Sequence, residues 1–245
     1  MGQKKKFREG QKEQTLDDLS FVFIETVKKL KPRVVIMENV EGLILGEAFS
    51  YVQQIYKGFQ DAGYFVHHWL LKGEYMGVPQ ARHRVFFVAC RADLEIDPSW
   101  LDMSFNYYPV TFKEIAGGTP RKMKTETQQY KMLCLAKPNK EHAIKDILKR
   151  ECGKSSCFND LVTWLDEVPP TQTAKGNIML GDEKRKISDL EAIRIQTFPE
   201  DYYFGNQNIS YVCGMSVPPV IMKKVVIRLI EQGVFDYARP LHKLS

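Results

Sequence analysis

Two short segments carry side chains of the kind that bind and activate a polar ring. The first, Val34-Val-Ile-Met-Glu38-Asn39-Val40, is a β-branched apolar run that ends in an acid and an amide. Such a run is typical of a buried parallel strand that delivers a carboxylate to a site. The second places Gln80, Arg82 and Arg84 at alternate positions, directly ahead of another apolar run. If the backbone there is extended, all three side chains share one face. One acid and two guanidinium groups suit a site that holds a phosphate backbone and a polar heterocycle.

Two later segments carry further motifs. They are Arg185-Lys-Ile-Ser-Asp-Leu-Glu191-Ala-Ile-Arg194-Ile-Gln196-Thr-Phe198-Pro199 and Gly214-Met215-Ser216-Val217-Pro218-Pro219. Together the four segments resemble motifs of the cytosine-C5 DNA methyltransferases, in the family's order and at plausible spacing. Residues 38–40 resemble the ENV motif and residues 80–84 the QxRxR motif. The third segment resembles the helix that ends in RLQ-x-FP, and the fourth resembles GNSVPP.

Two motifs of that family do not occur in these 245 residues. The family binds S-adenosylmethionine through a glycine-rich strand and loop, and it attacks the base with the Cys of a Pro-Cys dipeptide. Here no FxGxG-like segment occurs, and the five cysteines follow Ala89, Leu133, Glu151, Ser156 and Val212. The opening Gly2-Gln-Lys-Lys-Lys-Phe-Arg resembles the basic stretch shortly after the Pro-Cys. We therefore expect the C-terminal two-thirds of a methyltransferase, as a split subunit or a fragment, inactive as this chain alone.

The resemblance implies a role for each matching residue. Glu38 would hold N3 and the exocyclic amine of the target cytosine, and Arg84 would hold O2, so that both stabilise the charge that develops on the ring. Gln80 and Arg82 match positions that order the catalytic loop and contact backbone phosphate. Taken alone, Glu38-Asn39-Val40 is also compatible with a structural role for Glu38, as an acid at the end of a strand that pairs with a nearby arginine.

The remaining implied sites concern the cofactor and the choice of DNA sequence. Met215, Ser216 and Val217 match the loop beside S-adenosylmethionine, but Met215 replaces an Asn, and a thioether lacks the donors of a carboxamide. Most of the cofactor site is expected on the missing part.

The window from Lys137 to Trp164 carries basic and small polar residues suited to phosphate and base-edge contacts, among them Lys154, Ser155 and Asn159. A solvated helix face explains each of these residues singly. His142, Cys152 and Cys157 fit no common zinc spacing, so no metal is expected.

Composition limits the partners and the cellular compartment that are expected for the protein. A net charge of +5 permits nucleic acid as a partner without demanding it. Scattered cysteines without a CxxC pair favour a reducing cytoplasm, in a prokaryotic or phage-type cell interior. No apolar run is long enough to cross a bilayer, so no membrane association is expected.

The periodicity of apolar residues predicts the elements that position these motifs. We expect helices at 16–30, 49–62, 141–151, 188–197 and 218–231 and strands at 33–38, 64–71 and 84–90, with a capping box between Ser188 and Glu191. The fold class is then α/β: the second half of a doubly wound S-adenosylmethionine-dependent methyltransferase sheet, plus a small loop-rich DNA-recognition domain. The expected division is a catalytic half at 1–92, a target-recognition domain at 93–208 and a C-terminal return at 209–245.

Three functional hypotheses remain open. The chain is one part of a split methyltransferase that acts on double-stranded DNA, completed by a second polypeptide with the glycine-rich loop and the Pro-Cys nucleophile. Alternatively, it is a catalytically inactive, sequence-specific DNA-binding or regulatory remnant, although such a binder has no need of a cytosine pocket. A third possibility is a broken gene of a full-length enzyme.

Overall fold

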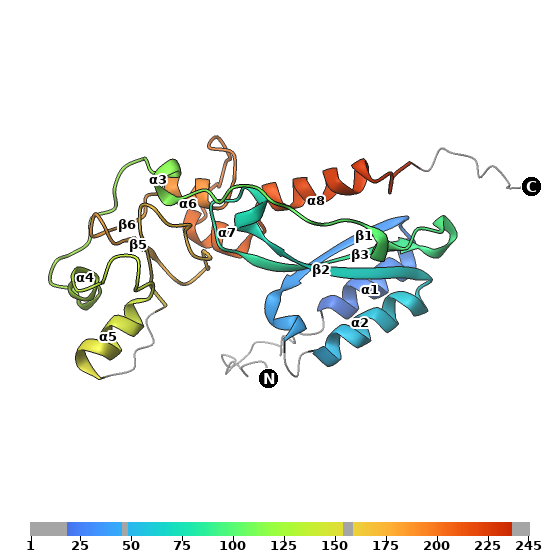
Figure 1. Ribbon diagram of the computed structural model, residues 1–245, viewed down its shortest axis with the longest axis horizontal. Coiled ribbons are helices and arrows are strands. Elements are labelled where there is room, and N and C mark those ends of the chain that lie inside the picture. The colour runs from blue at the N-terminus through green and yellow to red at the C-terminus, as the bar shows by residue number, and fades with distance from the viewer. Residues whose placement is uncertain (1–18, 46–48, 154–158, 237–245) are drawn as a thin grey trace, which may run out of the picture. The chain divides into compact units, whose positions relative to one another are not determined.

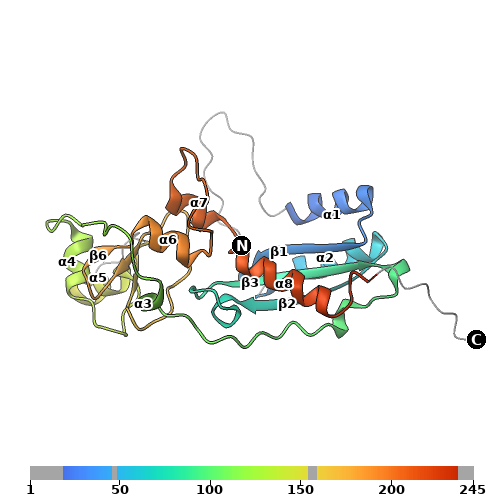
Figure 2. The ribbon, with the colours of Figure 1, turned by 90° about the horizontal axis from the view of Figure 1, so that it is seen from above.

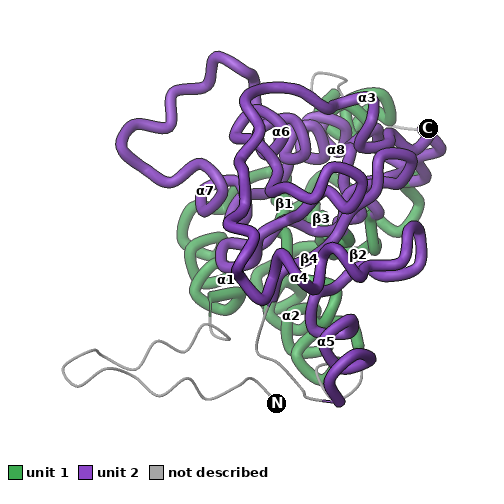
Figure 3. The backbone as a smooth tube through the Cα atoms, turned by 90° about the vertical axis from the view of Figure 1, so that its left-hand side faces the viewer, with its two compact units in different colours: residues 1–71, 83–103, 227–245 green, residues 72–82, 104–226 purple. Residues whose placement is uncertain are grey.

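The computed structural model describes residues 19–45, 49–153 and 159–236 (Figure 1). The chain divides into two compact units, one of residues 1–71, 83–103 and 227–245 and the other of residues 72–82 and 104–226 (Figure 3). The functional division expected from the sequence stays a prediction. The compact units differ from it at residues 72–82, which carry Gln80 and Arg82, and at residues 209–226. Both segments belong to the second unit.

The first unit is a three-stranded sheet with two helices packed on one face (Figure 1). Its elements are α1 (Leu19–Leu30), β1 (Val34–Val40), α2 (Phe49–Asp61), β2 (Tyr64–Lys72) and β3 (His83–Arg91). The strand order is β1-β3-β2. β1 and β3 are antiparallel, with Val34 opposite Cys90 and Val40 opposite Arg84. The sequence pattern predicts a parallel strand at Val34–Val40, whereas the pairing that the structure describes for it is antiparallel.

Apolar spacing explains why these segments form these elements. In α2 the buried residues Val52, Ile55 and Phe59 recur at intervals of three and four, which places them on one helical face. They pack with the buried residues of α1 and of the sheet, including Met37 and Phe87. Burial at alternate positions in β1 gives the sheet its helix-covered face. Because Phe59 is fully buried, truncation to Ala would cost about 3–5 kcal/mol.

The second unit contains a smaller sheet and several short helices. The strands are β4 (Leu161–Thr163), β5 (Ile178–Leu180) and β6 (Arg185–Lys186), in the order β4-β5-β6. The helices are α3 (Phe112–Ile115), α4 (Gln128–Cys134), α5 (Ile144–Cys152), α6 (Asp189–Ile195), α7 (Ile209–Met215) and most of α8 (Pro219–Glu231). The strands, α3, α4 and α7 were not predicted, because elements of two to seven residues are too short to show a period.

Two apolar clusters support this second unit. One joins α4 and α5 to β4, Trp164 and Met179, and the other joins Phe112 to β5 and α6. Trp164 leaves no room for a side chain at Gly181, where a Cβ atom would lie 2.4 Å from its ring. The described chain thus contains a packed core within the window that the sequence marks as loop-rich.

The longer predicted helices agree well with the structure. α2, α5 and α8 begin and end within three residues of their expected bounds. The capping box of α6 is confirmed, since the Ser188 hydroxyl accepts from the Glu191 amide and the Glu191 carboxylate accepts from the Ser188 amide. The α/β class is therefore confirmed, with sheet and helices in each unit.

Candidate functional site

The first unit brings Glu38 and Arg84 into direct contact. The pairing of β1 and β3 places Glu38 opposite Phe86 and Arg84 opposite Val40, so the two charged residues are diagonal neighbours on one face of the sheet. Arg84 Nε lies 2.8 Å from Glu38 Oε1, and the side chains are 15% and 23% exposed respectively. Arg84 Nη1 also donates to the carbonyl of His83 at 2.7 Å. The pair is partly shielded and still reachable from solvent.

Neighbouring polar groups fix the backbone around this pair. Asn39 Oδ1 accepts from the amide of Val40 at 2.8 Å, and Asn39 Nδ2 donates to Ser20 Oγ at 3.3 Å. Asn39 therefore shapes the end of the strand. His83 Nδ1 lies 3.4 Å from Glu41 Oε2, on the turn that follows β1. These contacts hold the ends of β1 and β3 in register beside Glu38 and Arg84.

Gln80 and Arg82 lie in the interior of the second unit. Gln80 is 0% exposed and Arg82 is 3% exposed. Arg82 Nη1 donates to the carbonyl of Gln172 at 2.9 Å, and Nη2 donates to the carbonyl of Ser216 at 2.9 Å. The two side chains share a face, as predicted, with Arg82 Nη1 3.4 Å from Gln80 Oε1. In this arrangement the Arg82 guanidinium binds carbonyl groups of its own chain, and its expected contact with backbone phosphate stays a prediction.

Gln80 and Gln196 extend this network to the end of α6. Gln80 Nε2 donates to the carbonyl of Ile195 at 3.1 Å and to Gln196 Oε1 at 2.9 Å, while Gln80 Oε1 accepts from the amide of Gln172. Gln196 Nε2 in turn donates to the carbonyl of Ser216 at 2.5 Å. Three of the sequence motifs therefore meet in one buried cluster. The part played by Gln172 was missed from the sequence, because its backbone makes the contacts.

Gly214 allows the close approach on which this cluster depends. A Cβ atom at Gly214 would lie 2.3 Å from the carbonyl carbon of Thr173 and 2.4 Å from the amide of Ala174. Any side chain at this position would therefore push the end of α7 away from residues 173–174. Ser216 turns inward as well, since its hydroxyl donates to the carbonyl of Val212 at 2.7 Å. Met215, the last residue of α7, is 63% exposed.

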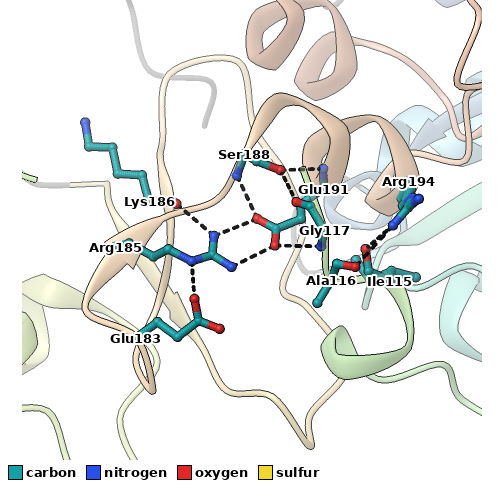
Figure 4. Close-up of polar contacts among 9 residues, drawn as sticks. All are labelled: Ile115, Ala116, Gly117, Glu183, Arg185, Lys186, Ser188, Glu191 and Arg194. Atoms are coloured by element: carbon teal, nitrogen blue, oxygen red, sulfur yellow. Dashed lines mark hydrogen bonds and ion pairs between the residues drawn. The ribbon is translucent and has the colours of Figure 1, made fainter. Parts of the chain in front are cut away.

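A buried ion pair anchors the start of α6 (Figure 4). Arg185 Nη1 and Nη2 donate to the two carboxylate oxygens of Glu191, each at 2.8 Å, and Glu191 is fully buried. Burial alone would raise the pKa of Glu191, but hydrogen bonds from Arg185, Ser188 and Gly117 outweigh it and hold that pKa below its ordinary value. The hydrogen bond to Glu191 raises the pKa of Arg185.

Arg194 connects the same helix to α3. Its Nη1 donates to the carbonyls of Ile115 and Ala116, and its Nε donates to Glu200 at 2.7 Å. The contacts of Arg185, Glu191 and Arg194 thus hold α6 within the second unit.

The predicted DNA-contacting residues of the second unit are only partly described. Asn159 is exposed and lies two residues before the start of β4. Lys154 and Ser155 lie outside the described residues. Some basic residues of the window are engaged within the unit: Arg150 pairs with Glu141 at 2.7 Å, and His142 with Glu167 at 2.9 Å. These pairs remove Arg150 and His142 from the first candidates for DNA contacts.

The described residues hold no cluster of three or more His, Cys, Asp or Glu side chains that could bind a metal ion. They also include no helix long and apolar enough to cross a membrane.

The sequence of this chain is similar to those of known methyltransferases. The sequence model of the family described as C-5 cytosine-specific DNA methylase matches residues 1–231. The type II methyltransferase M.MthTI of Methanothermobacter thermautotrophicus is 26% identical over 242 residues, which cover 87% of this chain and 70% of that protein. The type II methyltransferase M.BspRI of Lysinibacillus sphaericus is 25% identical over 260 residues, which cover 92% of this chain and 58% of that protein.

Solved structures show the fold. A DNA modification methyltransferase encoded within an Escherichia coli prophage superposes with a TM-score of 0.60 at 17% identity, covering 88% of this chain and 74% of that one. A DNMT2 variant of Spodoptera frugiperda gives a TM-score of 0.58 at 15% identity, covering 91% and 76%. The architecture is therefore that of an α/β methyltransferase, as the sequence predicts.

Proposed function

This chain belongs to the C-5 cytosine-specific DNA methylase family, and on that premise we propose that it is the part of a DNA (cytosine-5-)-methyltransferase that holds the target base. The observation that carries the proposal is the contact between Glu38 and Arg84 at the ends of two paired strands. The Glu38 carboxylate can bind the amidine-like edge of a ring, and the Arg84 guanidinium can bind a carbonyl oxygen. Arg84 Nε lies 2.8 Å from Glu38 Oε1. Their spacing suits neighbouring polar positions of one pyrimidine.

The chemistry of C5 methylation explains what these groups would do. A thiolate adds to C6, electron density moves into the ring toward N3 and O2, and C5 becomes nucleophilic. Glu38 would bind N3 and the exocyclic amine. Arg84 would donate to O2, while the contact of its Nε with Glu38 and the hydrogen bond from its Nη1 to the His83 carbonyl hold the side chain in place. Donors fixed in advance stabilise such charge without reorganisation.

S-adenosylmethionine, the cofactor of this family, would supply the methyl group. The residues described here do not hold it by themselves: in the segment 214–217, the carbonyl and the hydroxyl of Ser216 are engaged within the chain, and the exposed side chain of Met215 is a thioether. A thioether offers dispersion contact and at most a weak acceptor. We infer that Met215, Ser216 and Val217 border the cofactor, and that most of its binding groups lie on another segment.

That other segment would also carry the nucleophile. None of the five cysteines follows a proline, and no glycine-rich FxGxG segment occurs in the 245 residues. The two buried thiols, Cys90 and Cys213, have a pKa raised to about 11 by burial, the opposite of what a nucleophilic thiolate requires. The proposed partners are therefore double-stranded DNA and a polypeptide that carries a glycine-rich loop and a Pro-Cys.

We propose that the second unit selects the DNA sequence in which the cytosine is methylated. The window 137–165, with Asn159 exposed and with Lys154 and Ser155 outside the described residues, has the polar side chains that read phosphates and base edges. The chain would act inside the cell, in the setting of a restriction-modification or orphan methyltransferase.

One experiment tests the proposal. The chain would be incubated with DNA and labelled S-adenosylmethionine, first alone and then after co-expression with the part of M.MthTI that this chain does not span. The chain alone should yield no 5-methylcytosine, and the co-expressed pair should yield it. Transfer by the chain alone contradicts the need for a second polypeptide. If neither transfers methyl groups while the chain binds DNA tightly, the binding or regulatory remnant is the better account.

A further inference from the structure

The outer edge of β1 offers backbone groups to another strand. The sheet order β1-β3-β2 puts β1 at the edge, and among the described residues only β3 pairs with it. The amide of Arg91 donates to the carbonyl of Arg33, which fixes the phase of the antiparallel ladder. Counting from this pair, Val34 and Ile36 direct their N–H and C=O groups away from β3. The amide of Val40 agrees with this phase, because it bonds to its neighbour's side chain instead of to β3.

A stripe of apolar side chains on α1 lies on the same side of the sheet. Figure 2 shows α1 on the β1 side, away from β2. Ile24 and Val27 face the core, whereas Leu19, Val22 and Leu30 are 59–74% exposed. These three residues recur at intervals of three and eight, so they form one line along the helix. A seven-residue strand edge beside exposed apolar side chains is a surface on which proteins associate.

The connection between α1 and β1 indicates what would cover this surface. α1 leads into β1 through residues 31–33 and packs on the same sheet, which is the geometry of the second half of a β-α-β unit. In such a unit the helix spans two parallel strands, and the crossover is right-handed. Here Ile24 and Val27 of α1 share a core with residues of β1, and the exposed stripe of α1 would lie over the second parallel strand.

We propose that the outer edge of β1 and the Leu19–Val22–Leu30 stripe bind a parallel β-strand of the polypeptide that supplies the glycine-rich loop and the Pro-Cys nucleophile. This inference rests on the proposed function and adds to it the surface through which the two parts join. Two observations support this occupant over others. Related chains of the same fold are longer, since this chain covers 74% and 76% of the two solved structures. The surface also lies on the sheet that carries Glu38, so the added strand would extend the site itself.

Hydrogen exchange of the purified chain tests whether the edge is open. The amides of Val34 and Ile36 should exchange much faster than those of Val35 and Met37, which face β3. Equal and strong protection of all four would overturn the proposal, since the edge would then already be covered. If that protection falls on dilution, a second copy of the chain is the occupant, and if it persists, residues 1–18 are.

Two substitutions test the docking itself, with the unspanned part of M.MthTI as the probe. Ile36→Pro removes an outward N–H and blocks strand addition without removing a β3 bond, and Val22→Glu places a charge in the stripe. Each should weaken association with the probe at least tenfold. Ile36→Val, which keeps the N–H, and Gln53→Glu, which makes the same charge change on the exposed face of α2, should leave it unchanged.

The outcomes separate docking from function. Strand addition relies on main-chain bonds, so sequence differences between the probe and the natural partner matter little. No association of the wild-type chain with the probe, or association unaffected by Ile36→Pro and Val22→Glu, overturns the docking surface. Association that these variants weaken, without methyl transfer in the wild-type complex, supports the surface and contradicts the proposed function. Transfer unaffected by both variants supports the function and overturns the surface.

Discussion

The contact between Glu38 and Arg84 is the observation on which the proposed base-binding site rests. Each residue alone has an ordinary structural use. Held together at the ends of β1 and β3, they present an acid and a guanidinium at fixed separation before any ligand arrives. Such pre-organisation lowers the entropy that binding would otherwise lose.

Replacing Glu38 tests its assignment. In the completed enzyme, Glu38→Gln should reduce methylation by about two orders of magnitude or more, the usual scale for loss of a positioned proton donor or acceptor. DNA affinity should change far less, because the rest of the interface is untouched. Single-turnover rates and DNA binding would be measured for this variant and for Glu41→Gln, which changes the neighbouring acid. A wild-type rate in Glu38→Gln would show that the acid is structural.

The burial of Arg82 leads to a prediction that opposes the family role. Arg82→Ala leaves the carbonyl of Gln172 without its donor and removes one of the two donors to the carbonyl of Ser216. An unsatisfied buried group costs about 1–3 kcal/mol. The variant should therefore unfold at lower urea concentration than wild type, while the salt dependence of DNA binding stays the same. A phosphate contact would instead reduce the slope of log K against log salt by about 0.9. A slope reduced by that amount, at unchanged stability, would restore the phosphate role.

Among the secondary-structure elements, α6 carries the strongest electrostatic prediction. The pKa of Glu191 is held below its ordinary 4.5, so the stabilisation it provides is complete above that value and is lost as the pH falls through the lowered pKa. Glu191→Gln should destabilise the fold at neutral pH by about 3–5 kcal/mol, since it leaves Arg185 buried beside a neutral partner.

The same variant should also lose part of the acid sensitivity of the wild type. Urea unfolding at pH 7 and at stepped pH values below 4.5 would measure both effects. Glu183→Gln is the matched control: its carboxylate pairs with the same arginine from an exposed position and should contribute less than about 1 kcal/mol. If Glu191→Gln and Glu183→Gln lower the free energy of unfolding by the same amount, the buried ion pair contributes no more to stability than the exposed one.

Some of these elements could be predicted from the sequence, because local patterns of residues encode them. α2, α8 and the capping box of α6 could be predicted because periodic apolar residues and a local cap encode them. The positions of Glu38 and Arg84 follow from the motifs, but their contact depends on the antiparallel register of β1 and β3. The burial of Gln80 and Arg82 was not predictable from residue type, because charged and amide groups are interior only when a distant segment supplies partners. Here residues 172, 196 and 216 supply them.

At the scale of the whole molecule, the residues proposed to hold the target base and those proposed to read the DNA sequence lie in different compact units. Glu38 and Arg84 belong to the first unit, and the window 137–165 belongs to the second. A unit with its own packed core can change its surface without disturbing the other. The structure also shows which positions of that window must be kept, because Ile144, Ile147, Leu148, Val162 and Trp164 form its core.

This separation predicts that sequence specificity can be transplanted. A cytosine within a duplex must be extruded before a thiol reaches C6, and the remaining bases are read from the groove. A chimera of the completed enzyme would take residues 137–165 from a related methyltransferase at exposed positions and keep the five core residues of this chain. It should methylate the donor's sites at a rate near that of the parent, as bisulfite sequencing of treated DNA would show. A control chimera that exchanges the exposed residues of α2 should keep the original sites. An active window chimera that still marks the original sites would place recognition outside residues 137–165, either elsewhere in this chain or on its partner.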